Sequence, residues 1–301
     1  RVIGWVNHIR SKVRSGAVPP SEFIDLNHLL HALRLIKSPA EQDVMRASCE
    51  LAARAHVRAM EFCKPGLFEY QLEAEIQHEF AMGGAPQVAY TSIVGGGANA
   101  CVLHYISNNC VLQEGDLVLI DAGCEYQGYA ADITRTFPVS GRFSPAQRAL
   151  YDLVLDAQLA AIAEVKPGNH WNQPHEAAVR VLTAGLVRLG LLQGELDALI
   201  EAQAYRPFYM HRTGHWLGMD VHDVGDYKVD GQWRLFEAGM ALTVEPGLYI
   251  AKNDTQVEEK WRGIGIRIED DVLVTATGCE VLTDGVPKKA VAIEALMAAQ
   301  G

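Results

Sequence analysis

The sequence lacks any run of about 18 consecutive apolar residues, the length at which a membrane-spanning helix is expected. It also lacks an excess of basic charge, since 26 lysines and arginines stand against 37 aspartates and glutamates and give a formal net charge of −11. Proteins that bind nucleic acid in general present a basic face. We therefore expect neither a membrane span nor a nucleic-acid partner.

Paired cysteines are missing as well. None of the six cysteines belongs to a C-x-x-C pair, and they are scattered through apolar stretches, at Cys49, Cys63, Cys101, Cys110, Cys124 and Cys279. This pattern indicates reduced, buried thiols. With the acidic composition and the lack of a signal-peptide pattern, it leads us to expect a cytoplasmic location. The first residue is Arg1 rather than methionine, so we expect a fragment or a processed form.

Helix-like and strand-like segments alternate in blocks. Helical patterns cover about 1–16, 41–63, 69–82, 145–164, 174–189 and 194–204, and capping boxes with a first-position proline begin at Ser38 and Ser144. Strand-like segments read VAYTSIV, CVLHYI, DLVLIDAG, YAADITRTFPV, MALTVEPGLYI, GIGIRIED and DVLVTA. The order of helices, strands, helices and strands predicts an α+β fold with two halves of similar plan.

Four carboxylates and one histidine lie in or beside these apolar, strand-like runs. They are Asp121, Asp132, His215, Glu245 and Glu269. A buried acid costs free energy unless a partner compensates its charge. Five such exceptions in one chain favour a shared metal site over five unrelated accidents.

Strand periodicity suggests how these residues face one another. Asp121 and Asp132 flank a turn at 126–128, and we expect them opposite each other in a hairpin. By the period of two, Asp132 should share a face with Thr134 and Thr136. The alternative is an exposed hairpin with ordinary surface acids, which the buried character of the LVLI run disfavours.

The same periodicity applies to the second half. Glu245 should share a strand face with Thr243, and Arg267 with Glu269. Arg267 then either pairs with an acid or orients a metal-bound carboxylate or a substrate.

Four histidines fall near the acids: His104, His211, His215 and His222. The last three form a His-x3-His-x6-His pattern in a loop that contains glycine and tryptophan, which favours function. The other seven histidines lie in helices or loops away from these acids, and we expect structural roles for them.

Four carboxylates and one imidazole are hard ligands that suit Mn²⁺, with Co²⁺, Zn²⁺ and Fe²⁺ as alternatives. Two divalent ions would nearly neutralise the four carboxylates. Two ions about 3.5–4 Å apart can share a water and lower its pKa, which gives hydroxide at neutral pH. A carboxylate can act as general base, and histidines can polarise a carbonyl. Hydrolysis of an amide is the natural reaction for this set.

At these motifs the chain resembles the pita-bread metallopeptidases, a group that includes methionine aminopeptidase, prolidase, creatinase and aminopeptidase P. The resemblance covers about residues 38–301. The segments YTSIVGGGANACVLHY, HWLGMDVHDVGDY, LTVEPGLYI and RGIGIRIEDD look most like the bacterial aminopeptidase P (Xaa-Pro aminopeptidase) branch. The resemblance implies two similar αβ halves around a curved antiparallel sheet. It also implies hydrolysis of the bond between an N-terminal residue and a penultimate proline by a hydroxide that bridges two metals.

The resemblance further implies a role for each ligand. Asp121 would be a terminal ligand of one metal, and Asp132 and Glu269 would bridge both. His215 and Glu245 would hold the other metal, and Glu245 would also be the candidate general base.

Substrate roles follow from the same resemblance. His104 would handle the proton or the leaving group, and His222 would contact the substrate carbonyl. The wall on the proline side of the substrate would be formed by His211, Tyr249 and Arg267, with Tyr227 as a further candidate.

Proline-specific members of this family carry an amino-terminal domain before the catalytic one. We expect residues 1–37 to be a remnant of that domain and its linker, and residues 38–301 to be the catalytic domain. The partners would be proline-containing peptides, and the full-length form would be a homo-oligomer, a dimer or a tetramer.

Other functions share parts of this pattern. Prolidase, which cleaves only Xaa-Pro dipeptides, has the same ligands, so substrate length has to separate the two enzymes. Non-enzymatic pita-bread domains bind peptides or proteins but usually lose metal ligands, and all five remain here. Creatinase-like chemistry and methionine aminopeptidase fit the HWLGMDVHDVGDY segment less well.

Overall fold

The long helices begin where the sequence signals predict. In the computed structural model, which describes residues 1–299, α3 (Pro39–Phe62) begins after Ser38, whose backbone N–H donates to Glu41 Oε2 at 2.7 Å. The Ser38 hydroxyl in turn accepts the Glu41 N–H at 3.4 Å and completes the capping box. α5 (Pro145–Ala163) begins after Ser144 in the same way. The other helices are α1 (Val2–Arg10), α2 (Asn27–Leu35), α4 (Glu69–Met82), α6 (Gln173–Arg188), α7 (Leu196–Glu201) and α8 (Ala290–Ala298).

All strand pairs among the described residues are antiparallel. In the first half, the sheet order is β2–β3–β6, beside a small sheet of order β1–β4–β5. These strands are β1 (Gln87–Val88), β2 (Ile93–Gly96), β3 (Leu117–Asp121), β4 (Cys124–Tyr126), β5 (Tyr129–Ala130) and β6 (Thr134–Pro138).

In the part of the chain that the structure describes, the second half has one three-stranded sheet and two pairs of strands. β9 and β13 flank β12, while β10 pairs with β11 and β7 with β8. The strands are β7 (Lys228–Val229), β8 (Gln232–Trp233), β9 (Ala241–Val244), β10 (Gly247–Ile250), β11 (Ile264–Arg267), β12 (Asp270–Val274) and β13 (Cys279–Val281).

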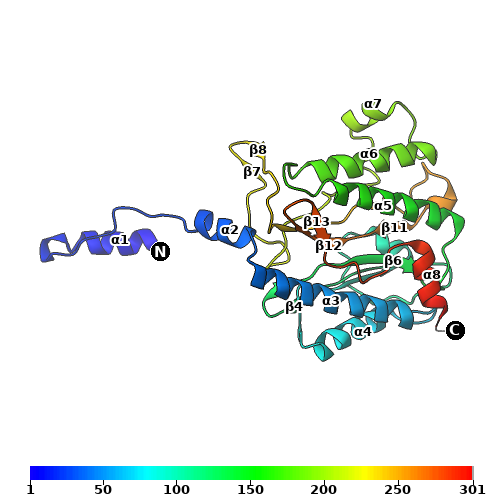
Figure 1. Ribbon diagram of the computed structural model, residues 1–301, viewed down its shortest axis with the longest axis horizontal. Helices are drawn as coiled ribbons and strands as arrows, with labels where there is room; N and C mark the ends of the chain where they lie inside the picture. The colour runs from blue at the N-terminus through cyan, green and yellow to red at the C-terminus, as the bar shows by residue number, and fades with distance from the viewer. Residues whose placement is uncertain (300–301) are drawn as a thin grey trace.

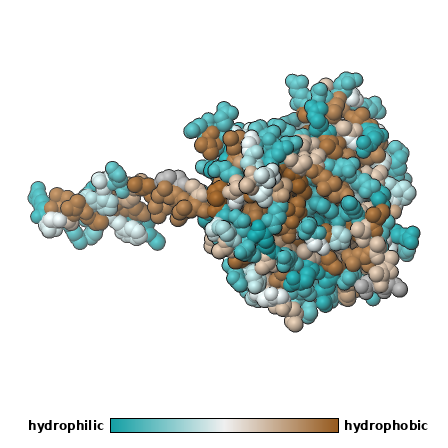
Figure 2. All heavy atoms as spheres, in the orientation of Figure 1, coloured by the Kyte–Doolittle hydropathy of each residue, from teal (hydrophilic) through white to brown (hydrophobic). Residues whose placement is uncertain are grey.

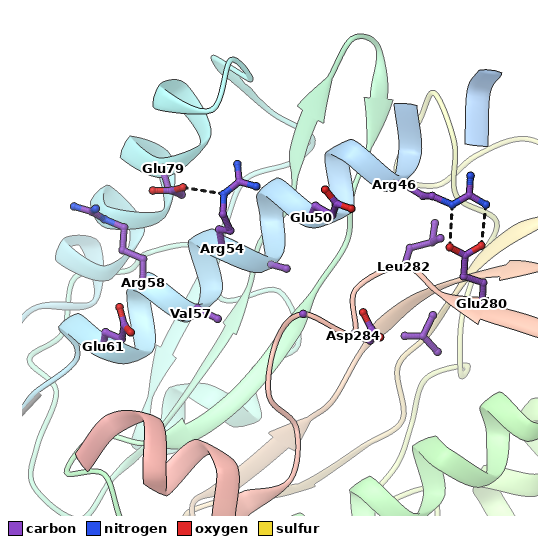
Figure 3. A pocket seen from close by; sticks show the side chains of 13 residues that line it. Arg46, Glu50, Arg54, Val57, Arg58, Glu61, Glu79, Glu280, Leu282 and Asp284 are labelled. Atoms are coloured by element: carbon purple, nitrogen blue, oxygen red, sulfur yellow. Dashed lines mark hydrogen bonds and ion pairs between the residues drawn. The ribbon is translucent and has the colours of Figure 1, made fainter. Parts of the chain in front are cut away.

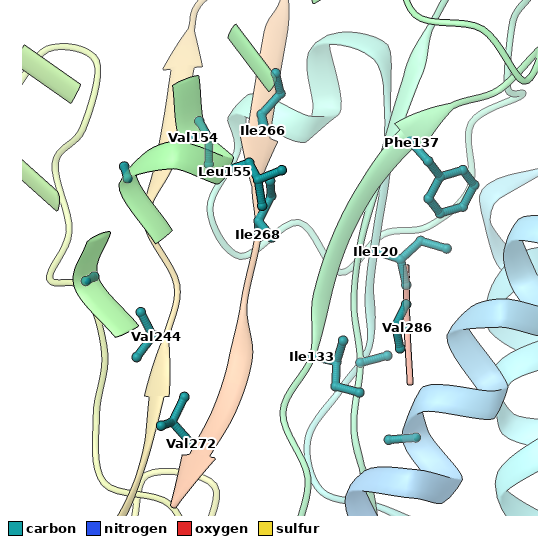
Figure 4. Close-up of a cluster of buried hydrophobic side chains, with 14 of the residues drawn as sticks. Ile120, Ile133, Phe137, Val154, Leu155, Val244, Ile266, Ile268, Val272 and Val286 are labelled. Carbon is teal, nitrogen blue, oxygen red and sulfur yellow. The ribbon is translucent and has the colours of Figure 1, made fainter. Parts of the chain in front are cut away.

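A pair of helices covers each half. The strands lie between α3 with α4 on one side and α5 with α6 on the other (Figure 1). Ile120 and Phe137 point toward the α3 side, while Val154 of α5 lies near Ile266 (Figure 4). Burying such side chains fully contributes about 1.5–3 kcal/mol each. The prediction of an α+β fold with two similar halves is therefore confirmed.

Several predicted strands are wrong in detail. The segment VAYTSIV is divided between β1 and β2, and MALTVEPGLYI between β9 and β10. The segment CVLHYI forms no strand, because residues 97–101 make a 3₁₀-helix and Val102 and Ile106 are exposed rather than paired. The predicted strand YAADITRTFPV is split into β5 and β6. Between them, Asp132 donates its backbone N–H to Asp271 Oδ2 at 2.9 Å. The predicted helix 194–204 is also shorter, since α7 spans Leu196–Glu201.

The first 37 residues differ from the rest in exposure. α1, which is followed by a short 3₁₀-helix (Val13–Ser15), and α2 extend away from the helices and strands of the two halves (Figure 1). Apolar side chains are visible along this arm in Figure 2, and Leu33 is among the exposed ones. At its end, Leu35 and Lys37 are buried against the body. None of the described helices is both long and apolar enough to cross a membrane.

Candidate active site

Asp121 and Asp132 meet through a third residue. Asp121 ends β3 and is paired with Thr134, so the predicted direct opposition of Asp121 and Asp132 is wrong by two residues. The carboxylates nevertheless converge, because the Tyr90 hydroxyl donates to Asp121 Oδ1 at 2.5 Å and also contacts Asp132 Oδ1. Tyr90 is not among the predicted site residues, since a tyrosine ahead of a short strand is ordinary.

Glu245 and Glu269 come from the second half. Glu245 follows β9, and Thr243 Oγ1 donates to Glu245 Oε1 at 3.3 Å, which confirms the shared face. Glu269 precedes β12 and accepts the Thr134 hydroxyl at 2.5 Å. Arg267 Nε also donates to Thr134 Oγ1, at 3.1 Å, so Arg267 and Glu269 face the same point of β6. Thr134 thus joins the two halves at the site.

His215 lies among these acids with a defined orientation. Its Nε2 is 3.3 Å from Asp132 Oδ2 and 3.7 Å from Glu245 Oε1. Its Nδ1 is 2.9 Å from the Trp216 carbonyl, which favours the tautomer with the proton on Nδ1 and leaves Nε2 for a ligand. Asp132, His215 and Glu269 each offer a ligand atom within 4.8 Å of the others.

The acids crowd negative charge in a buried place. Burial, and then the charges of Asp132 and Glu245, raise the pKa of Glu269 well above its usual range. Burial raises the pKa of Asp132 and brings that of Glu245 to about 7. Burial alone would lower the pKa of His215, but the hydrogen bond and charge of Asp132 outweigh it and raise the value to about 9. We call the place where Asp121, Asp132, His215, Glu245 and Glu269 converge the pit. Without a cation, the pit therefore holds protons.

A polar wall stands beside the pit. Arg267, 4% exposed, donates to Tyr249 Oη at 3.0 Å and forms an ion pair with Asp121 Oδ2 at 2.5 Å. His211 Nε2 lies 2.8 Å from the same Tyr249 hydroxyl. Burial, and then the Arg267 charge, lower the pKa of His211 to about 4. Three of the four predicted substrate-side residues are thus linked through the Tyr249 hydroxyl.

The pit opens into a cleft of about 400 Å³. The other two candidate histidines, His104 and His222, line it, and the rings of His215 and His222 meet edge-on at 4.3 Å. Burial, and then the His215 charge, lower the pKa of His222. Apolar side chains complete the lining, at Ile93, Leu103, Ile106 and Val221.

Tyr227 is not brought to this cleft. Its ring stacks on Trp216 with centroids 5.6 Å apart and packs against Trp171 at 4.6 Å. Its hydroxyl accepts the Trp216 backbone N–H at 3.4 Å. These contacts give Tyr227 a structural place behind the loop that carries His215.

A larger hollow of about 670 Å³ lies elsewhere, over α3 and β13 (Figure 3). Several of its charged side chains are paired, since Arg46 pairs with Glu280 at 2.8 Å and Arg54 with Glu79 at 3.3 Å. It contains none of the predicted site residues. The smaller cleft is therefore the candidate active site.

Several known proteins are similar to this chain in sequence or in fold. The profile of metallopeptidase family M24 matches residues 43–276. The Xaa-Pro aminopeptidase of Escherichia coli K12 is 53% identical over 298 residues, which are 98% of this chain and 67% of that protein. The structure of Pseudomonas aeruginosa aminopeptidase PepP is 64% identical, with a TM-score of 0.98, and is covered over 68% of its length by all of this chain.

Zinc-substituted E. coli aminopeptidase P in complex with product is a further solved relative, with 52% identity and a TM-score of 0.96. The match includes 100% of this chain and 68% of that structure's chain. The chain spans about two thirds of the length of the curated relatives it matches. The match in fold to aminopeptidase P confirms the pita-bread architecture. The chain belongs to metallopeptidase family M24.

Proposed function

We propose that this chain is the catalytic part of an Xaa-Pro aminopeptidase, a hydrolase that releases the residue before a penultimate proline. One observation carries the proposal. Asp121, Asp132, His215, Glu245 and Glu269 converge in one cleft, beside the wall formed by His211, Tyr249 and Arg267. The relatives named Xaa-Pro aminopeptidase support the substrate class.

The donor set fits two divalent cations. Four carboxylates and a free imidazole nitrogen are hard ligands, and the raised pKa values of three of the acids indicate that Arg267 and His215 leave part of the negative charge uncompensated. Asp121 would hold one ion, His215 and Glu245 the other, and Asp132 and Glu269 would bridge both. We propose Mn²⁺ as the metal, with Co²⁺, Zn²⁺ and Fe²⁺ as alternatives. Bound there, the ions would lower the pKa of the attacking water and polarise the scissile carbonyl.

The chain's own residues then handle protons and position the peptide. Glu245 is the candidate base, since its carboxylate faces the ligand atoms from the edge of the cleft. His222, neutral near pH 7 because its pKa is lowered, can donate an N–H hydrogen bond to the substrate carbonyl. His104 lines the same cleft and can protonate the leaving proline nitrogen.

The wall would receive the proline side of the substrate. Arg267 is held on three sides, by Asp121, Thr134 and Tyr249, so its guanidinium is fixed before substrate arrives. Ile93 and Leu103 add apolar surface in the cleft. A small apolar ring and a peptide carbonyl therefore suit this place, and we take proline-containing peptides as the ligands.

Further parts of the proposal concern the whole protein. We propose that residues 1–37 are a remnant of an amino-terminal domain and that 38–301 are the catalytic domain. We also propose that the full-length form is a dimer or a tetramer and works in the cytoplasm.

Substrate length and sequence test the proposal. The metal-loaded protein should cleave Arg-Pro-Pro and should spare Arg-Ala-Pro, in which the penultimate proline is replaced. Cleavage of Gly-Pro without Arg-Pro-Pro would instead indicate prolidase. Binding of metal without cleavage of either peptide would refute the enzymatic proposal for this chain.

A further inference from the structure

The segment that carries His222 has little regular structure to hold it. After Trp216, which forms an isolated bridge with Leu242, the described chain has no helix or strand until β7 begins at Lys228. His222 itself is exposed at the cleft. A side chain that must contact a substrate within tenths of an ångström therefore needs a tether from elsewhere in the fold.

Asp223 supplies such a tether. It is only 6% exposed although it neighbours His222, and both its carboxylate oxygens are paired. Oδ1 accepts from Arg34 at 2.5 Å, and Oδ2 accepts from Lys37 Nζ at 3.0 Å. The side chains of Lys37 and Asp223 are each 1% exposed, so this pair is not a screened surface contact.

The cationic partner is itself held rigidly. Lys37 donates its backbone N–H to the Gly239 carbonyl at 2.8 Å, and its own carbonyl accepts Gln42 Nε2 at 2.9 Å. The next residue, Ser38, caps α3. Lys37 Nζ is thus fixed to the body of the protein at the start of its longest described helix.

Close packing leaves this arrangement little freedom. A Cβ on Gly218 would lie 2.1 Å from Asp223 Oδ2 and 2.9 Å from Lys37 Cε. Asp223 is held toward Lys37, and the ring of the preceding residue, His222, lies at the cleft against that of His215.

We propose that Lys37 and Asp223 are positioning residues that hold His222 against the substrate. The inference rests on the proposed function and assigns a part in building the active site to a residue from the segment 1–37. The ion pair acts on the loop rather than on the metal ligands. Its loss should therefore reduce turnover through His222 and leave metal affinity unchanged.

The test is a double-mutant cycle with an independent measurement of loop order. The variant Lys37→Met/Asp223→Leu removes both buried charges together, and Arg34 keeps its ion pair with Asp220 at 2.7 Å, so no charge is left without a partner and folding is preserved. In the otherwise native chain, we expect kcat for Arg-Pro-Pro to fall about 10–100-fold. In a His222→Ala background the same double change should cost less than about twofold, because the group it positions is already gone.

Two further measurements separate positioning from general damage. Hydrogen exchange of residues 216–226 should accelerate in the double variant, and the metal Kd measured by calorimetry should stay within about twofold. Arg180→Met is a matched control, since it breaks an exposed ion pair with Asp197 and should change none of these quantities.

Equal losses of kcat in both backgrounds would overturn the inference, and so would unchanged exchange in 216–226. A metal Kd that weakens as much as kcat would also overturn it, because the pair would then act through the ligands. Failure of the native chain to cleave peptide would refute the proposed function instead, while the exchange experiment would still decide whether the tether exists.

Discussion

Metal binding to the pit should release protons, because several of its ligands are protonated when no cation balances them. Burial brings the pKa of Glu245 to about 7, and Asp132 raises that of His215 to about 9 despite burial. A bound metal requires both groups to be deprotonated. Near pH 6, Glu245 and His215 together should therefore release about two protons, and Glu269, whose pKa is also raised, adds to this number.

The number should fall as the pH rises. Near pH 8.5, Glu245 is ionised before the metal arrives and His215 is partly neutral, so these two groups should release about one proton. Calorimetry of Mn²⁺ binding in two buffers of different ionisation enthalpy measures the count directly. Glu245→Gln should remove about one proton of the release near pH 6, while Glu61→Gln, an exposed acid, should not change it. Release that is absent near pH 6, or that grows with pH, would refute the reasoning about the pit.

Three other perturbations test the pit, the wall and the core. The pKa values of Glu245 and His215 are higher in the folded, metal-free protein than in the unfolded chain. Each group therefore stabilises the metal-free fold fully at a pH below its unfolded-state pKa, by roughly 3 kcal/mol. This stabilisation is lost as the pH rises through about 7 for Glu245 and about 9 for His215. The melting temperature of the chelated protein should consequently fall further below that of the loaded protein at pH 9 than at pH 5, and an equal gap at both would contradict this. His211→Ala should leave metal affinity nearly unchanged but raise KM for Arg-Pro-Pro, since His211 contacts Tyr249 in the wall; loss of metal would show that its role is misassigned. Arg135 forms an ion pair with Asp270 at 2.7 Å in which both side chains are fully buried. Arg135→Met should lower the unfolding free energy in urea by about 3–5 kcal/mol, because Asp270 keeps only Lys288 as a cationic partner, whereas Arg148→Met, at an exposed ion pair with Asp152, should cost less than about 1 kcal/mol.

Much of the site could be predicted because its residues lie at strand ends. Asp121 closes β3 and Glu245 follows β9, so apolar runs located them in the sequence. The capping box at Ser38 likewise gave the start of α3 from four consecutive letters. Local patterns of this kind need no knowledge of distant contacts.

The features that were not predicted from the sequence depend on contacts between residues far apart in the chain. The hairpin register shifted by two residues where Asp132 turns its backbone N–H to Asp271, a residue 139 positions away. Tyr90 bridges two acids only because the folded strands bring them to it. The Lys37–Asp223 pair spans 186 positions, so no local pattern could indicate it.

Restoration of activity by metal tests the central claim most directly. The protein would be chelated, shown to be free of metal, and assayed on Arg-Pro-Pro before and after Mn²⁺, Co²⁺ or Zn²⁺ is added back separately. The account predicts no cleavage without metal and recovery with Mn²⁺ as two ions bind per chain. Full cleavage by the verified metal-free protein would contradict the claim that these five residues form a catalytic metal centre.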